Sequence, residues 1–521
     1  MINFDFCMNR RAAALFLACS MAASAQAAEP RISVGSEHML LVKSDGSLWS
    51  WGRDSWGQLG LNGAGNKNVP TQIAGASGFI DVIARGSFSM ALKADGTVWA
   101  FGDNSNGRVG PYNDRAKVPV QVTGLSRIVA IGAGWGYSAY AIDEDGNVWS
   151  WGANSAGQLG IGTSDVMSHP TPILVPGLAG VLAVSASDET TLALLSDGTV
   201  AAWGYNPDGG LGVTPIGSVV APKAITGLTG LSAIAAANSN ISNGHFALDN
   251  NGSVWSWGDN TFSTVDCGQK RPNSAAYTIP VEIDNLPAVK QISGGDGHVL
   301  FVTENGTVAG CGTNNWGQLG DGSTTHTSAE NTGPLLAQGL SRVTWVAAGN
   351  NASAAITDDG GVWTWGKTDS GLSGTGVDGA SDSRNTTPVK LNVNAGIPAH
   401  YPAIFAGTQS GELRDTAIDV GFAPAATDVG KMGRLYIAAQ LPDGALFLLN
   451  QSGDFEFYTD GALPYLYEGE LPRHGPITFG SGDFSGVSGV TLIIGYGVGT
   501  GAAAEAELFQ SGRYASILTL Q

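Results

Sequence analysis

One nine-residue phrase occurs seven times along this chain, with 50 to 54 residues between the starts of successive copies. The copy NNGSVWSWG begins at Asn250 and combines a turn, an apolar residue and two tryptophans two positions apart. The other copies begin at Ser44, Ala94, Glu144, Ser196, Glu304 and Asp358. Self-similarity at such a period marks a repeat architecture, in which every repeat is one supersecondary unit.

Each copy predicts a β-hairpin. Asp-Gly or Asn-Gly supplies the two residues with positive φ that a two-residue hairpin loop needs. The alternation that follows is the period-two pattern of a strand, so Trp255 and Trp257 share one face. We expect the tryptophans of the phrase to pack between neighbouring repeats. Ten of the 14 belong to it: Trp49, Trp51, Trp99, Trp149, Trp151, Trp203, Trp255, Trp257, Trp363 and Trp365.

A second phrase follows the tryptophan pair, as in WGRDSWGQLG from Trp51 and WGANSAGQLG from Trp151. Its glycines and asparagines indicate a loop, and a proline-containing stretch comes next. About fifty residues accommodate four short strands, and seven such units predict an all-β chain folded as a seven-bladed β-propeller.

The motifs have a family resemblance. The G-x-x-H elements at Gly35–His38 and Gly295–His298, the DG-x-V-W-x-WG phrase and the N-x-x-GQLG loop resemble the regulator of chromosome condensation repeat family. The resemblance implies a closed seven-bladed ring, which we place at residues 31–395. It also implies protein contacts through propeller faces, as in relatives that are exchange factors for small GTPases or secreted inhibitors of β-lactamase.

The N-terminus predicts a signal peptide over residues 1–27. Arg10 and Arg11 precede an apolar segment, and Ala25-Gln26-Ala27 is a small-residue cleavage site. Met8 is an alternative start, and acylation of Cys19 is an alternative to cleavage after Ala27. We therefore expect an exported protein, which is periplasmic, cell-surface or extracellular. No later segment predicts a membrane span.

Charge narrows the choice of partners. The net charge is −19, and the predicted signal peptide carries one net positive charge, which leaves −20 on the mature chain. An acidic chain without Lys/Arg clusters argues against nucleic acid. It favours instead a protein partner with a neutral or basic surface, of unknown identity.

The repeats end near Leu391. Residues 396–412 predict a linker, and residues 413–521 carry new apolar segments separated by turns such as PDG at Pro442. This pattern predicts a small C-terminal β domain resembling a β-sandwich.

No pattern for catalysis, a cofactor or a metal emerges. Asp143-Glu144-Asp145-Gly146-Asn147 resembles part of a calcium loop but lacks its bidentate glutamate, and the turn already explains it. His38, His245 and His298 fall at equivalent places in three repeats, which favours a structural role. In the mature chain Cys267 and Cys311 remain, and both a disulfide and two free thiols are compatible with the sequence.

Aromatic residues in the variable loops are the candidate partner-binding residues: Trp56, Trp135, Tyr205, Phe262 and Trp316. Packing over the blade ends is the structural alternative, but aromatics dominate protein-binding hot spots. We therefore expect a non-catalytic recognition protein. The alternative is a carbohydrate-binding or carbohydrate-active propeller, including contact with a cell-surface glycan, which as an enzyme would need a carboxylate pair in one cleft. An exchange-factor role is less compatible with export.

Overall fold

The computed structural model describes residues 29–396 apart from gaps at 112–114, 136, 208, 214–216, 240–241, 260–266, 268–275, 326–333, 378 and 380–381. Beyond residue 396 it describes backbone strands only. The described residues contain β-strands and no α-helix, as the repeats predict.

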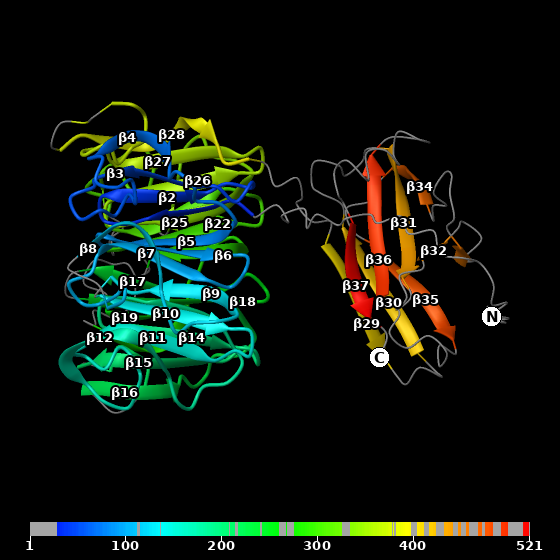
Figure 1. Cartoon of the computed structure of the whole chain (residues 1–521), viewed down its shortest axis with the longest axis horizontal. Coiled ribbons are helices and arrows are strands. Elements are labelled where there is room, and N and C mark those ends of the chain that lie inside the picture. Colours follow the sequence, from blue (N-terminus) through cyan, green and yellow to red (C-terminus); the bar gives the residue numbers. More distant parts are fainter. Residues whose placement is uncertain are drawn as a thin grey trace. The chain divides into compact units, whose positions relative to one another are not determined.

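Residues 31–394 form seven four-stranded antiparallel sheets, the blades of a β-propeller (Figure 1). The four strands of every blade are consecutive in the sequence. Blades 1 and 2 comprise β1 (Arg31–Val34), β2 (His38–Val42), β3 (Leu48–Gly52), β4 (Lys67–Gln72), β5 (Phe79–Arg85), β6 (Phe88–Lys93), β7 (Val98–Asp103) and β8 (Arg115–Gln121). Blades 3 and 4 comprise β9 (Ile128–Ala133), β10 (Ser138–Asp143), β11 (Val148–Asn154), β12 (Asp165–Leu174), β13 (Val181–Ala186), β14 (Thr190–Leu195), β15 (Val200–Asn206) and β16 (Gly217–Ala224).

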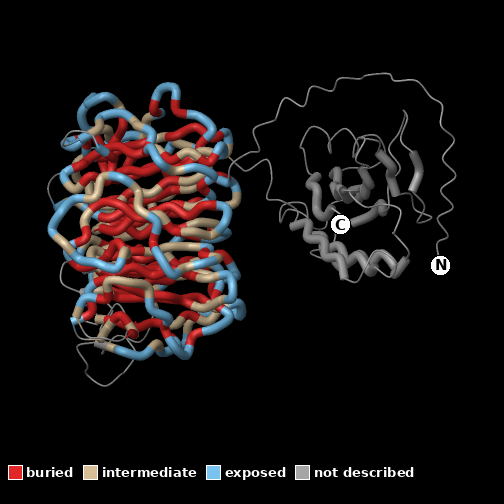
Figure 2. The backbone as a smooth tube through the Cα atoms, turned by 60° about the horizontal axis from the view of Figure 1, so that its bottom comes forward, coloured by how far each residue is buried: buried red, intermediate tan, exposed pale blue. Residues whose placement is uncertain are grey.

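The remaining blades follow the same plan. Blades 5 and 6 comprise β17 (Leu231–Ser239), β18 (Ser242–Asp249), β19 (Val254–Asp259), β20 (Ala276–Glu282), β21 (Val289–Gly294), β22 (His298–Thr303), β23 (Val308–Gly312) and β24 (Leu335–Leu336). Blade 7 comprises β25 (Val343–Ala348), β26 (Ala352–Thr357), β27 (Gly361–Lys367) and β28 (Arg384–Asn394). The first strands of neighbouring blades contact one another around the ring, and buried residues follow the sheets while exposed ones follow the turns and the rim (Figure 2).

The hairpin turns differ from the two-residue loop expected from Asp-Gly. In blade 1 the backbone N–H of Lys43 donates to the carbonyl of Ser47, which leaves a three-residue loop. Gly46 has a φ of 73°, whereas Asp45 is not among the residues with positive φ. The carboxylate of Asp45 instead accepts a hydrogen bond from the Ser47 N–H at 2.9 Å. This side-chain cap, typical of Asp in turns, makes a second left-handed residue unnecessary.

Every complete fourth strand is interrupted by proline opposite the second aromatic residue. In blade 1, Ser50 pairs with Thr71 and Gly52 with Lys67, so a bulge containing Pro70 separates the two pairs. Pro119, Pro222 and Pro388 occupy the corresponding bulges of blades 2, 4 and 7. Proline lacks an N–H donor, and bulged, proline-bearing edges resist pairing with another strand.

The ring closes without exchanging a strand between its ends. The indole Nε1 of Trp51 in blade 1 donates to the carbonyl of Leu372 in blade 7 at 3.1 Å. Asn68 and Gly376 exchange two hydrogen bonds, and Ser44 donates its N–H to the carbonyl of Ala395 at 2.9 Å. Side chains and loops therefore join blade 7 to blade 1.

Residues 398–521 belong to a separate compact unit, while residues 28–397 form the propeller unit. The tail contains a three-stranded sheet and a six-stranded sheet. Its strands are β29 (Ile404–Ser410), β30 (Thr416–Ala423), β31 (Met432–Gln440), β32 (Leu446–Leu449), β33 (Phe455–Phe457), β34 (Tyr467–Glu470), β35 (Gly475–Gly482), β36 (Thr491–Val498) and β37 (Tyr514–Thr519). Strand β29 lies inside the segment 396–412 that the sequence predicts as a linker.

Candidate partner-binding face

The up-and-down order of the strands divides the propeller into two faces. The loop face carries the turns between the first and second strands of each blade and the loops between the third and fourth. The turn face carries the Asp-Gly turns and the connections between blades. Strand β1 begins and β28 ends at the turn face, so the chain enters and leaves the ring on that side. In Figure 1 the loop face is on the left of the propeller.

The structure places four of the five predicted aromatic residues on the loop face. Trp56 and Tyr205 are 43% and 42% exposed, and Trp316 is half-buried. Trp135 differs from the expectation of an exposed contact residue, because it is only 7% exposed. Phe262 lies outside the described residues. Trp56, Tyr205 and Trp316 therefore remain available to a partner.

The loops that carry Trp56 and Trp316 are held by the same pair of hydrogen bonds in two different blades. The backbone N–H of Trp56 donates to the side-chain oxygen of Gln58 at 2.8 Å. Arg115 from the next blade donates to the carbonyl of Ser55 at 3.0 Å, and its guanidinium lies 5.9 Å from the Trp56 ring centroid. These hydrogen bonds order the loop backbone, and a tryptophan side chain, with only two χ angles, presents its apolar area at a low conformational-entropy cost on binding.

The Trp316 loop repeats this arrangement. The Trp316 N–H donates to the side-chain oxygen of Gln318 at 2.9 Å. Arg384 of blade 7 donates to the Asn315 carbonyl at 2.6 Å and lies 5.7 Å from the Trp316 centroid. Lys367 lies 5.3 Å from the same ring. The two tryptophan loops therefore carry cations beside their aromatic surfaces.

Blades 2 and 3 carry a second group of cations and aromatic rings. Arg85 lies 4.9 Å from the Trp135 centroid, and burial lowers the pKa of Arg85 to about 10. Arg108, fully buried, lies 4.5 Å from the Phe88 centroid and 5.0 Å from that of Tyr137. Burial lowers the pKa of Arg108 to about 10, while the carboxylate of Asp103 opposes this effect. Both side chains remain charged at neutral pH.

These two arginines interrupt the repeat. Arg108 stands where three other loops have glutamine, whose side-chain oxygen accepts a backbone N–H as in Gln58, Gln158 and Gln318. A guanidinium has no acceptor and cannot replace this bond. Within the described propeller, Arg108 Nε and Nη1 and Arg85 Nε are buried without a hydrogen-bond partner.

Tyr137 is a loop-face aromatic residue that the sequence reasoning missed. It is 46% exposed and has a φ of 75°, which is uncommon for a residue other than glycine. It follows Trp135 by two positions in the Gly-rich segment GAGWGYSAY. This segment is the only sequence signal for an aromatic residue at this place, and it does not reveal whether the ring of Trp135 or that of Tyr137 is exposed.

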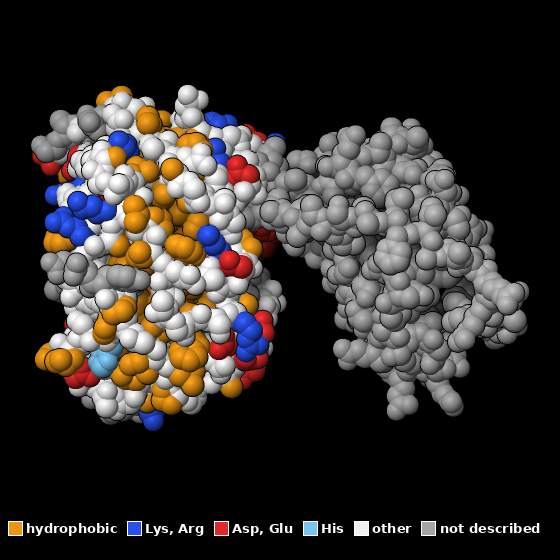
Figure 3. Space-filling view, viewed as in Figure 1, with side chains coloured by type: hydrophobic (Ala, Val, Ile, Leu, Met, Phe, Trp, Pro, Cys, Tyr) orange, Lys and Arg blue, Asp and Glu red, His pale blue; other side chains and the backbone are white. Residues whose placement is uncertain are grey.

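Charge is divided unevenly over the loop face. Among the described residues, its lysines and arginines all come from blades 7, 1 and 2, a group that we call the cationic sector: Arg53, Lys67, Arg85, Arg108, Arg115, Lys117, Lys367 and Arg384. Blades 3 to 6 contribute carboxylates to the described part of this face: Asp165, Asp188, Glu189, Asp259, Asp296 and Asp321. Figure 3 shows Lys and Arg side chains gathered at the left-hand edge of the propeller, beside β4 and β8, and acidic side chains farther down that edge near β12.

Some of the positive charge is paired locally. Glu37 contacts Arg53 and Lys367, and Lys367 also lies 3.2 Å from the Asp369 carboxylate. Asp103 lies 3.4 Å from Arg108. Arg115, Lys117 and Arg384 are exposed and have no carboxylate partner among the described salt bridges.

The buried histidines connect neighbouring blades. Nε2 of His38 lies 2.8 Å from Ser89 Oγ, and Ser89 donates its hydroxyl to the carbonyl of Gln58. Because the hydroxyl proton is used there, His38 donates from Nε2. Burial lowers the pKa of His38 to about 3. His298 and Ser353 repeat this contact at 3.0 Å.

His245 is not equivalent to the other two histidines, contrary to the sequence-based expectation. His38 and His298 pair with glycines of the third strand, whereas His245 pairs with Trp257. It therefore falls one position later in its blade, and its ring lies 5.6 Å from that of Trp257. Burial lowers the pKa of His245 to about 3, which fits a packed, neutral side chain.

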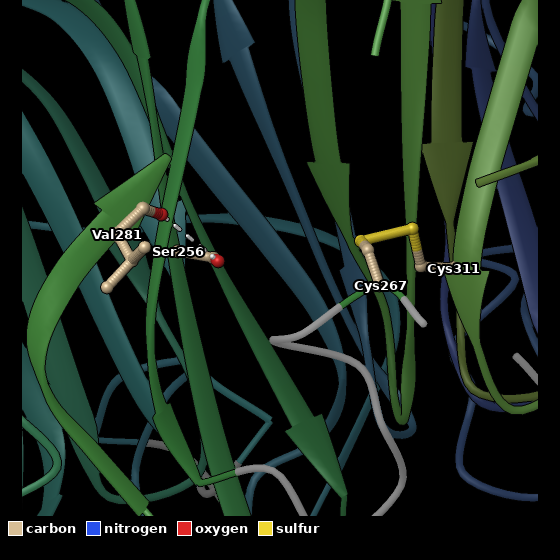
Figure 4. The surroundings of a disulfide bond; sticks show 4 residues. All are labelled: Ser256, Cys267, Val281 and Cys311. Carbon is tan, nitrogen blue, oxygen red and sulfur yellow. Dashed lines mark hydrogen bonds between the residues drawn. A yellow bond between two sulfur atoms is a disulfide. The ribbon is translucent and has the colours of Figure 1, made fainter. Parts of the chain in front are cut away.

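The second tryptophan of a repeat links its blade to the preceding one. Trp203 and Trp365 are buried and donate from Nε1 to the carbonyls of Gln158 and Gln318, each at 2.7 Å. Cys311 occupies this position in blade 6 and forms a disulfide with Cys267 of blade 5, with 5.1 Å between the Cα atoms (Figure 4). In the same view, Ser256 and Val281 join two strands of blade 5 through a 3.5 Å hydrogen bond.

Among the described residues, no three His, Cys, Asp or Glu side chains lie together in a group that could hold a metal ion. The same residues include no helix with the length and apolar character of a membrane span.

Sequence models of one repeat family match the part of the chain that forms the blades. Two models of the regulator of chromosome condensation (RCC1) repeat each match five segments, and together they span most of the ring. The chain belongs to the RCC1 repeat family. The first model matches residues 45–92, 95–141, 145–194, 251–302 and 305–356, and the second matches 31–58, 128–158, 181–209, 289–318 and 343–371. The first of these segments begins in the turn after β2 and ends within β6, so the RCC1 sequence repeat is offset from the blade.

Curated relatives share parts of this chain. The RCC1 domain-containing protein RUG3, mitochondrial, of Arabidopsis thaliana is 32% identical over 225 residues, which cover 41% of this chain and 47% of the relative. The ultraviolet-B receptor UVR8 of the same plant is 27% identical over 376 residues, 69% and 82% of the two chains. The probable E3 ubiquitin-protein ligase HERC6 of Homo sapiens is 30% identical over 211 residues. This match covers 39% of the present chain and 20% of the ligase.

Solved structures share the RCC1 propeller fold. Prp20p of Saccharomyces cerevisiae, described with its binding properties to Gsp1p and histones, superposes with a TM-score of 0.56 at 21% identity. The superposition covers 66% of this chain and 85% of Prp20p. Human WBSCR16 gives a TM-score of 0.57 at 19% identity, over 67% and 95% of the two chains.

Proposed function

We propose that this RCC1-repeat protein is an exported, non-catalytic recognition protein that contacts another protein through its loop face. The observation that carries the proposal is the exposure of Trp56 and Tyr205, with half-buried Trp316, on the face opposite both ends of the ring. Loops that vary around a constant scaffold can acquire specificity without disturbing the fold.

The comparisons support protein contact as the general role. Prp20p, a relative in fold, is described with binding to Gsp1p and histones. Its partners are not transferred to this chain, because the identity is only 21%. The predicted signal peptide and the Cys267–Cys311 disulfide support export, since disulfides persist in oxidising compartments. An exported partner is therefore expected.

Site-specific photo-crosslinking tests the proposal. A benzophenone amino acid is introduced at Trp56 on the loop face or, as a control, at exposed Lys223 on outer strand β16, and the protein is expressed in its native host. We expect a discrete crosslinked protein from position 56 and none from position 223. Equal crosslinking at both positions, or crosslinking from position 223 alone, would place the contact elsewhere.

A further inference from the structure

We propose that the cationic sector of the loop face, formed by blades 7, 1 and 2, docks an acidic, carboxylate-rich segment of the partner protein. This inference rests on the proposed function, because it names the partner chemistry that the same face recognises. The net charge of −19 predicts a neutral or basic partner, but net charge does not take into account where the charges lie on the surface. The inference replaces that expectation with an acidic partner.

The distribution of charge is the first argument. All described lysines and arginines of the loop face belong to three consecutive blades, which also place Glu37, Asp54, Asp103, Asp369 and Asp382 there and keep an excess of cations. The described part of blades 3 to 6 adds only carboxylates and His169 to this face. Lysine and arginine together number 25 against 44 acidic residues in the chain, so a described sector in which cations outnumber carboxylates departs from the overall balance. Opposed potentials across an interface steer association and fix its register.

The second argument is the hydrogen-bonding geometry of the exposed arginine side chains. Arg115 and Arg384 are exposed at the first position of β8 and β28, beside Trp56 and Trp316. Each donates through Nη1 to one loop carbonyl, and a guanidinium has five N–H groups. The remaining donors match a carboxylate in geometry, while the neighbouring ring offers apolar contact.

The third argument is the departure from the repeat in blade 2. Arg85 and Arg108 replace residue types that suffice in the other blades, and both have buried N–H donors without a partner among the described residues. Burying such donors destabilises a fold. Arg108 lies at the exposed ring of Tyr137 and Arg85 at the buried ring of Trp135, and both charges add to the potential of the sector.

Binding of a labelled oligoglutamate peptide to the full mature chain tests the inference, with fluorescence anisotropy as the readout. An oligolysine peptide and a Gly-Ser peptide serve as comparison probes. We expect oligoglutamate to bind best, with an affinity that falls as salt rises. The double variant Arg115→Glu/Arg384→Glu should weaken binding about tenfold, because two attractive charges become repulsive.

Two controls separate charge from loop damage. Lys223→Glu/Lys290→Glu makes the same change in net charge at exposed sites away from the loop face, and it should bind oligoglutamate like the wild type. Lys117→Glu reverses a sector charge whose alkyl chain lies near Gly57 and Gly63 but whose ammonium makes no hydrogen bond to either tryptophan loop among the described residues. It should weaken binding severalfold. Melting curves of all variants are compared with the wild type.

Several outcomes would overturn the inference. These are oligoglutamate binding no better than the Gly-Ser peptide, oligolysine binding best, or equal losses in both double variants. Sedimentation tests a second copy of the chain as the occupant: self-association lost in both Arg115→Glu/Arg384→Glu and Glu189→Lys would assign the sector to a homodimer instead. If crosslinking at position 56 persists while the charge variants bind normally, the loop-face function stands and the acidic partner does not.

Discussion

Cys311 and Cys267 form a covalent link between blades 5 and 6 at the position where a tryptophan–carbonyl hydrogen bond links other neighbouring blades. Cys311 is fully buried, as are Trp203 and Trp257 at the same place in blades 4 and 5. A disulfide therefore replaces a large aromatic side chain at one of the seven junctions.

Reduction should destabilise the ring. The disulfide closes a loop with a sequence separation of 44, and removing such a constraint costs roughly 2–4 kcal/mol. We expect a reductant to lower the urea midpoint of the wild type. The variant Cys267→Ser/Cys311→Ser should start at the lower midpoint and not respond to reductant. A wild type indifferent to reductant would contradict a stabilising disulfide.

The two tryptophans of one repeat should differ in importance. Trp257 is fully buried and donates to the carbonyl of Leu211, whereas Trp255 is half-buried. Trp257→Ala should lower the free energy of unfolding by roughly 3–5 kcal/mol, and Trp255→Ala by less. Chemical denaturation of both variants measures the difference. Equal losses would show that exposure does not set the contribution of these rings.

Acid should weaken the fold through its buried histidines. The folded pKa values of His38 and His298, about 3 and about 4, lie below the ordinary 6.5. As pH falls below 6.5 the unfolded chain binds protons that the folded chain does not, so unfolding becomes easier. Each histidine should remove up to about 1.4 kcal/mol per pH unit until its folded pKa is reached.

The histidine effect can be isolated with one substitution. His38→Gln retains an N–H donor toward Ser89 but does not titrate, so its free energy of unfolding should fall less than that of the wild type between pH 7 and pH 5. Urea unfolding at both pH values gives the comparison. Parallel losses in the two proteins would exclude His38 as a source of acid sensitivity.

Truncating the loop-face tryptophans should separate binding from stability. Trp56→Ala and Trp316→Ala should each weaken binding of the partner found by crosslinking, by roughly 1–2 kcal/mol or more if they are hot spots. Their melting curves should stay near that of the wild type. Val281→Ala, at a 40% exposed position on the outer rim, is the control. Normal binding by both tryptophan variants, or unfolding of both, would return these rings to a packing role.

Export should remove the first 27 residues. The small-residue site before Ala28 predicts a mature chain that begins AEPRIS. Intact mass spectrometry of the exported protein measures the N-terminus. A lipid-modified terminus at Cys19 would support acylation instead.

The sequence predicted the ring because its strongest signals are local and repeated. Period-two alternation and turn glycines recur in every unit, and they define seven hairpins without knowledge of tertiary contacts. The turn geometry was wrong in detail, since the Asp45 carboxylate caps its own turn and only Gly46 takes a left-handed conformation. Such side-chain capping depends on rotamers that composition does not specify.

Tertiary placement was harder to predict. Trp135 and Tyr137 lie two residues apart in a Gly-rich turn, yet one is buried under Arg85 and the other exposed. The Cys267–Cys311 pairing depends on which residues of adjacent blades come together, so the sequence left two alternatives open. The cationic sector could not be predicted without the fold, because its residues lie near the beginning and near the end of the propeller sequence.

The closure of the ring bears on where the chain could be cut and rejoined. Each blade is contiguous in sequence, and the Ser44–Ala395 hydrogen bond joins the β2–β3 turn of blade 1 to the end of blade 7 on the turn face. No strand is shared between blades 7 and 1, and a buried tryptophan donates to a carbonyl of the preceding blade there, as at the junctions of blades 3 and 4 and of blades 6 and 7. A circular permutant that opens between two other blades and joins the present ends by a short linker should therefore preserve every sheet. The order in which the blades are encoded can be rotated without altering the face that they present.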